Sequence, residues 1–93
     1  MRRHLLRSTA FVRATRRLVK RYPEMAESIR ATVAALAEDA FQPSLKTHKL
    51  KGDLAESWAC SAGYDLRIIF EFVQHEGAEA IQLQMIGTHD DVY

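Results

Sequence analysis

Two histidines, an arginine and a terminal aromatic residue are the side chains of this sequence best suited to chemistry. His48 lies among lysines in LKTHKLKGDL, Arg67 follows Asp65 in YDLRIIF, and His89 and Tyr93 belong to the final stretch MIGTHDDVY. Histidine has an unperturbed pKa of about 6.5, so it accepts or donates a proton near neutral pH. The planar guanidinium of arginine offers two parallel donors to a phosphate. The set is therefore suited to acid–base chemistry on a phosphate ester.

Cleavage of RNA by its own ribose 2′-hydroxyl needs these groups. The reaction requires a base for the hydroxyl, a cation for the phosphoryl oxygens and an acid for the departing 5′-oxygen. His48 or Asp65 is the candidate base, Arg67 the cation and His89 the acid, while Tyr93 is suited to stacking on an unpaired base. We expect no metal or cofactor, because these roles need none and the run HDDVY lacks the ligand spacing of a zinc site.

Each candidate residue also has a purely structural interpretation. His48 in a basic loop is by default a solvated surface residue, and Arg67 is placed to pair with Glu71 on the same strand face. Asp65 is suited to capping the turn before its strand, and Tyr93 to ordinary packing. Residue types alone leave these alternatives open.

Two amphipathic helices are predicted in the first half of the chain. In the first, an apolar side and a basic side separate at 100° per residue. The apolar side holds Phe11, Thr15, Leu18, Val19 and Tyr22, and the basic side holds Arg13, Arg16, Arg17, Lys20 and Arg21. Pro23 ends this helix, and the second, with Met25, Ile29, Val33, Leu36 and Ala40 on one face, ends before Pro43.

Beyond Gly52 the apolar period changes to two, which indicates strands. Residues 66–73 and 81–86 alternate, and His75–Gly77 between them favours an antiparallel hairpin. A shorter strand is expected at Ser57–Ser61, with or without another around Arg3–Leu6. We therefore predict an α+β fold in which an N-terminal αα-hairpin packs on a small three- to four-stranded antiparallel sheet.

This sheet would bring the candidate residues together. Period two places Asp65 and Arg67 on the face opposite Leu66 and Ile68, away from the main core. The loop at residues 46–51 enters the sheet, and the final segment leaves the last strand. We expect these ends to converge on one side.

Length and composition predict a single domain over residues 1–93. A chain of 93 residues, 47% hydrophobic, buries roughly 60–65% of its unfolded surface and has room for one core. No stretch approaches the roughly 18 apolar residues of a membrane span, and the start lacks the apolar run of a secretory signal. Cys60 is the only cysteine, so it excludes an internal disulfide and favours a reducing cytoplasm. We expect its thiol to be buried and inert.

The net charge of +1 conceals a basic start. Residues 1–23 contain eight arginines and lysines and no acid. Such a start is also typical of a mitochondrial transit peptide, but cleavage would remove a helix that the core needs. The alternatives for the basic face are a solvated surface or an RNA- and ribosome-binding surface. The residues assigned to that surface are Arg13, Arg16, Arg17, Lys20, Lys46, Lys49 and Lys51.

Three short motifs follow the two predicted helices. In chain order they are HKLKG at His48–Gly52, YDLRIIF at Tyr64–Phe70 and IGTHDDVY at Ile86–Tyr93. Over essentially the whole chain this arrangement resembles the RelE/YafQ group of bacterial type II toxins, in the RelE/ParE superfamily. The resemblance implies a microbial-RNase-like fold and cleavage of mRNA in the ribosomal A site. It also implies a cognate antitoxin, with operator DNA bound only through the toxin–antitoxin complex.

The resemblance implies a role for each motif residue. His48 matches the histidine of H-x-L-x-G, and Asp65 matches the acidic residue that opens the central strand. Arg67 sits where RelE-like members place a phosphate-stabilising arginine and where YafQ-like members have an apolar residue instead. His89 matches the histidine of G-[TS]-H, a general acid, and Tyr93 matches the terminal aromatic that contacts the substrate base.

One departure from the family pattern leaves alternatives open. Ser61 stands where YafQ-like toxins carry a further active-site histidine, so the base is either His48 alone or His48 together with Asp65. A ParE-like inhibitor of DNA gyrase shares the overall plan without the nuclease chemistry, and a degenerate toxin would act only as an antitoxin-binding regulator. The histidine pair His48 and His89 favours cleavage over the gyrase inhibitor, whereas the serine at position 61 keeps the degenerate alternative open.

Overall fold

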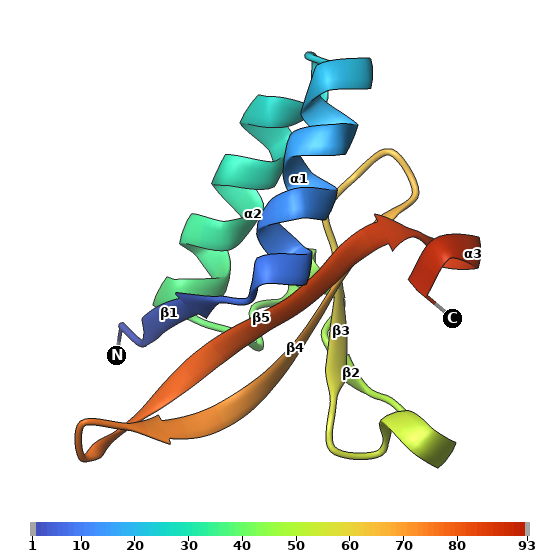
Figure 1. The fold of residues 1–93 in the computed structure, drawn as a ribbon. Helices are drawn as coiled ribbons and strands as arrows, with labels where there is room; N and C mark the ends of the chain where they lie inside the picture. The colour runs from blue at the N-terminus through green and yellow to red at the C-terminus, as the bar shows by residue number, and fades with distance from the viewer. Residues whose placement is uncertain (1, 93) are drawn as a thin grey trace.

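The computed structural model describes residues 2–92. Two helices lie side by side on one face of a five-stranded sheet, and a short third helix follows the last strand (Figure 1). In chain order the elements are β1 (His4–Arg7), α1 (Thr9–Arg21), α2 (Met25–Glu38), β2 (His48–Lys49), β3 (Trp58–Ser61), β4 (Leu66–His75), β5 (Ala78–Thr88) and α3 (His89–Val92). Single 3₁₀ turns at Pro43–Leu45 and Gly52–Leu54 flank β2.

The sheet is mixed, in the order β1-β5-β4-β3-β2. The predicted α+β class, the two helices and the antiparallel β3-β4-β5 centre are confirmed. The prediction of three or four antiparallel strands is wrong at both edges, because β1 pairs parallel to β5 and β2 adds a fifth strand beside β3. Elements of four and two residues are too short to show a period, so tertiary contacts decide their pairing and direction.

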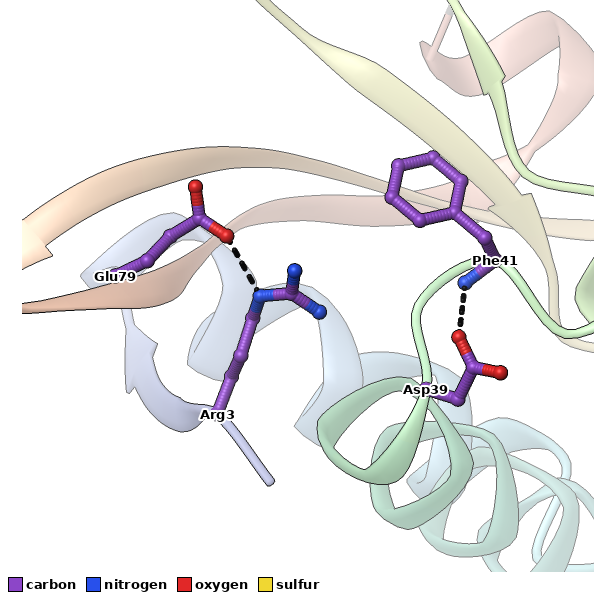
Figure 2. A network of polar contacts seen from close by, with 4 residues as sticks. All are labelled: Arg3, Asp39, Phe41 and Glu79. Atoms are coloured by element: carbon purple, nitrogen blue, oxygen red, sulfur yellow. Dashed lines mark hydrogen bonds and ion pairs between the residues drawn. The ribbon is translucent and has the colours of Figure 1, made fainter. Parts of the chain in front are cut away.

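Contacts of the N-terminal segment hold β1 in its parallel position. Arg3 donates from its backbone N–H to Ala37 O and from its side chain Nε to Glu79 Oε1, both at 2.8 Å. Figure 2 shows the second of these bonds, which joins the residue before β1 to β5. Figure 2 also shows the turn after α2, where Asp39 Oδ1 accepts from the Phe41 N–H at 3.0 Å. The two bonds of Arg3 connect α2 to the sheet.

Helix α1 has the two faces that its sequence predicts. Ser8 is its N-cap, and the Ser8 hydroxyl accepts from Phe11 N–H at 3.0 Å and donates to Gln84 O at 2.9 Å. Phe11 and Ala14 are buried against the sheet. The five basic residues of the opposite side are all exposed. The predicted amphipathic helix is therefore confirmed.

The core lies between the helices and one face of the sheet. Leu66, Ile68 and Phe70 of β4 are fully buried against α1 and α2. Arg67 and Glu71 alternate with them and are half-buried on the other face. The strand period thus fixes the side on which Arg67 lies. None of the helices within residues 2–92 has the length and apolar character needed to span a bilayer.

Cys60 is expected to resist alkylation in the folded protein. Its side chain is fully buried, and burial raises the pKa of its thiol from 9.0 to about 12. Since only the thiolate reacts, iodoacetamide at pH 8 should leave the native protein unmodified and label it once in denaturant. Intact-mass spectrometry measures this, and Ser44→Cys supplies an exposed thiol as control. Native labelling at equal rates on both residues would contradict the prediction.

Candidate active site

A pocket of about 390 Å³ gathers three of the predicted site residues. Its lining includes His48, Arg67 and His89, although they lie far apart in the sequence. The other lining residues are Lys49, Leu50 and Lys51. The predicted convergence is therefore confirmed for His48, Arg67 and His89. No acidic side chain of residues 2–92 is among the lining residues, so the pocket favours an anionic ligand.

Strand pairing positions His48 and Arg67 on one face. His48 pairs with Ala59, which pairs with Ile69, while Ser61 pairs with Arg67, which pairs with Gly87. Directly paired residues share a face of the sheet, and residues two apart on a strand also share it. His48 and Arg67 therefore lie on the same face, opposite the helices. His48 is further oriented by a contact of 3.1 Å between its Nδ1 and Lys46 O.

The turn from β5 into α3 positions His89. A Cβ added at Gly87 would lie 2.7 Å from Asp91 Cβ and 3.2 Å from Val92 Cγ1, so α3 folds back against the strand where only glycine fits. The carboxylate Asp91 Oδ2 accepts from the backbone N–H of Thr88 at 3.1 Å. This contact is half of a capping box, and it holds the first turn of α3. Since His89 is the first residue of that turn, these contacts determine its place beside Arg67.

The Asp91 carboxylate is held in its charged form. Hydrogen bonds from the Thr88 backbone and side chain lower its pKa below the usual range, and Arg17 of α1 acts in the same direction. A depressed carboxyl pKa means that the carboxylate, and the cap it makes, persist as the pH falls below the ordinary range of an aspartate.

The guanidinium of Arg67 is oriented without a carboxylate partner among residues 2–92. Arg67 Nη1 donates to Leu66 O at 3.1 Å, and the structure shows no ion pair to Glu71. Glu71 instead accepts from Gln84 Nε2 at 2.6 Å. Gln84 is the extra residue of a β-bulge in β5, and its Oε1 accepts from the Ser57 hydroxyl at 2.9 Å. The predicted alternative, an ion pair between Arg67 and Glu71, is therefore not formed, and the Glu71 carboxylate bonds to Gln84.

Other predicted site residues lie elsewhere. Asp65 is not on the strand face with Arg67, because it belongs to the turn before β4 and has φ +64°, and it does not line the pocket. The alternation with period two holds only within β4, which begins at Leu66, one residue after Asp65. Ser61 lies on β3 opposite Arg67 and also outside the pocket lining. Tyr93 lies outside the described residues.

The predicted RNA-binding residues divide between two parts of the molecule. Lys49 and Lys51 line the pocket, whereas Lys46 stands outside it in a left-handed turn with φ +52°. The basic residues of α1 are exposed on the helical layer, opposite the face that carries the pocket. Arg13, Arg16, Arg17 and Lys20 thus remain a predicted binding surface separate from the pocket.

Sequence reasoning missed Gly87 and Asp91 as supports of His89. The sequence contains a signal for them. Asp91 follows Thr88 by three residues, which is the spacing of a capping box, and Gly87 directly precedes Thr88. Within residues 2–92, no three His, Cys, Asp or Glu side chains are grouped so that they would hold a metal ion.

Comparison with known proteins gives a family and a fold for this chain. The profile of the family described as "Bacterial toxin of type II toxin-antitoxin system, YafQ" matches residues 3–93. No protein with a curated description matches the chain. Among solved structures, YafQ from E. coli strain BL21(DE3) superposes with a TM-score of 0.80 at 15% identity, over 98% of this chain and 98% of that one.

Two further structures share the fold. In the E. coli DinJ-YafQ toxin-antitoxin complex, the matching chain has a TM-score of 0.78 at 16% identity, covering 100% of this chain and 99% of its own. A YoeB/ParE toxin from Agrobacterium tumefaciens has a TM-score of 0.77 at 16% identity, covering 92% of this chain and 98% of its own. The resemblance found in the sequence is confirmed: the chain belongs to the YafQ family of toxins of bacterial type II toxin–antitoxin systems, with the fold of RelE, ParE and YoeB.

Proposed function

We propose that this toxin is an endoribonuclease that cleaves mRNA in the ribosomal A site. The observation that carries the proposal is the pocket in which His48, Arg67 and His89 meet, beside lysines and without an acidic lining residue. A phosphate is attracted there by charge, and two imidazoles flank it for proton transfer. A gyrase-binding module has no use for this combination.

The pocket residues supply each step of the reaction. His48 removes the proton of the ribose 2′-hydroxyl, and the 2′-oxygen forms a bond to phosphorus. Arg67 stabilises the charge that builds on the phosphoryl oxygens. His89 gives a proton to the departing 5′-oxygen as its bond to phosphorus breaks. The products are a 2′,3′-cyclic phosphate and a 5′-hydroxyl, and the mechanism uses no metal.

The base is assigned to His48 alone. Asp65 was the other candidate, but it lies in the turn before β4 and does not line the pocket. Tyr93 keeps its proposed part in stacking on the substrate base. The toxin would act in the cytoplasm, and Arg13, Arg16 and Lys20 on the exposed side of α1 would dock on rRNA phosphates. By likeness to the DinJ-YafQ complex, a cognate antitoxin would bind it, and the complex would repress its own operon.

The experiment adds purified protein to a reconstituted translation reaction and maps the message ends by primer extension. We expect cuts at A-site codons with the wild type and none with His89→Ala. His75→Ala is the matched control, because His75 stacks on His4 at the far end of the β4–β5 hairpin, 5.2 Å between ring centroids. Intact message and normal translation with the wild type would refute the nuclease and favour the gyrase-binding or degenerate alternative.

Removal of the Asp91 cap should lower cleavage while leaving the fold intact. We expect Asp91→Ala to slow the reaction by about tenfold, because α3 loses the acceptor that holds Thr88 and His89 is no longer fixed beside Arg67. Asp91→Asn keeps an acceptor oxygen and should recover most of the rate. Single-turnover cleavage and thermal melts measure both effects, and equal rates for the two variants would show that the cap does not position His89.

A further inference from the structure

A second hollow of about 540 Å³ lies between α1 and the end of β5. We call it the α1–β5 cleft. Arg17, Leu18, Arg21 and Tyr22 line one side of it, and residues 85–88 with Asp91 line the other. It shares a wall with the candidate active-site pocket, because the segment 87–91 gives His89 to the pocket and its other lining residues to the cleft.

The side chains of the α1–β5 cleft are suited to a nucleotide. Arg17 and Arg21 are exposed, and residues 2–23 contain no acid. Across the cleft, the Asp91 carboxylate interacts electrostatically with Arg17. The Arg21 guanidinium carbon lies 5.3 Å from the ring centroid of Tyr22, which is 37% exposed. A tyrosine and an arginine plane together form a surface on which a base stacks.

The remaining lining of the cleft agrees with this ligand. Leu18, Met85 and Ile86 form apolar surface, where the face of a base loses water at little cost. Among the described residues that line the cleft, Asp91 is the only acidic one, and its carboxylate accepts hydrogen bonds from Thr88. The cleft thus has cations for a phosphate and a flat aromatic surface for a base.

We propose that the α1–β5 cleft binds the nucleotide of the message next to the cleaved bond, with Arg17 and Arg21 on its phosphate and Tyr22 on its base. The inference rests on the proposed function, and it adds a specific RNA site that the catalytic pocket does not contain. The shared wall at residues 87–91 is the reason to assign the cleft to the message and not to rRNA. An RNA strand with its reacting phosphate at His89 needs only to cross this wall to reach Arg17.

Cleavage kinetics on message-programmed ribosomes tests whether the α1–β5 cleft binds the message. Arg21→Gln, which removes a charged contact, and Tyr22→Leu, which removes a stacking ring, should each raise the KM for message-programmed ribosomes by about tenfold, with kcat within about twofold of the wild type. Their affinity for vacant ribosomes should not change. Arg30→Gln is the matched control, since it removes the same charge from exposed α2, where Arg30 pairs with Glu27.

Each outcome separates the two proposals. Unchanged KM in both cleft variants, with an active wild type, would overturn the inference and leave the nuclease intact. An equal loss of affinity for vacant and programmed ribosomes would also overturn it, because the ligand would then be rRNA. A wild type that does not cleave would refute the proposed function, and with it the inference.

Discussion

Arg67→Gln is expected to slow message cleavage by roughly 10²–10³-fold, the usual cost of removing one donor that stabilises a transition-state oxyanion. Arg67 lies in the pocket with both histidines, and its guanidinium is oriented by Leu66 O at 3.1 Å. Glu71 bonds to Gln84 and makes no ion pair with Arg67 among residues 2–92. Single-turnover cleavage at saturating toxin measures the loss.

The lysine variant separates charge from geometry. Arg67→Lys keeps the positive charge but not the planar pair of donors, so we expect it to recover only part of the lost rate. Arg67 is half-buried on the face away from the core, so both variants should melt close to the wild type. A rate for Arg67→Gln within threefold of the wild type, with His89→Ala inactive, would remove Arg67 from the mechanism.

The sequence predicts the parts of this fold that repeat a period over many residues. Helix α1 and strand β4 show 3.6- and two-residue patterns, and the structure places their apolar sides in one core. Strands β1 and β2 contain too few residues for a pattern, and their pairing depends on distant partners such as Ala80 and Ala59. The edges of the sheet therefore could not be derived from local sequence.

The strand period also determines which candidate residues could be assigned to a face of the sheet from the sequence. Arg67 lies inside a long strand, so its face follows from that of its neighbours Leu66 and Ile68. Asp65 is one residue outside the strand, where a positive φ ends the alternation. The position of His89 depends on the reversal of the chain at Gly87, where the strand backbone lies close to α3. A periodic pattern of side chains does not predict such a contact.

Gly87→Ala is expected to reduce cleavage by about 100-fold while hardly changing stability. The new methyl group would lie 2.7 Å from Asp91 Cβ, so α3 must move away from β5 and take His89 with it. A displacement of about 1 Å at a catalytic group is enough for such a loss. Since α3 has no buried residue, its movement should leave the core and the melting temperature nearly unchanged. Cleavage rates and thermal melts of one preparation measure both quantities.

Gly77→Ala is the control with the opposite expected result, lower stability with unchanged cleavage. Gly77 lies in the β4–β5 turn with φ +81°, and no atom lies within 4 Å of an added Cβ, so its alanine variant suffers backbone strain without a clash. It should lose about 1 kcal/mol of stability and keep its cleavage rate per folded molecule, because the turn is remote from the pocket. The two glycines thus separate stability from the placement of His89. Full activity of Gly87→Ala would show that α3 reaches its catalytic position without the close approach seen here.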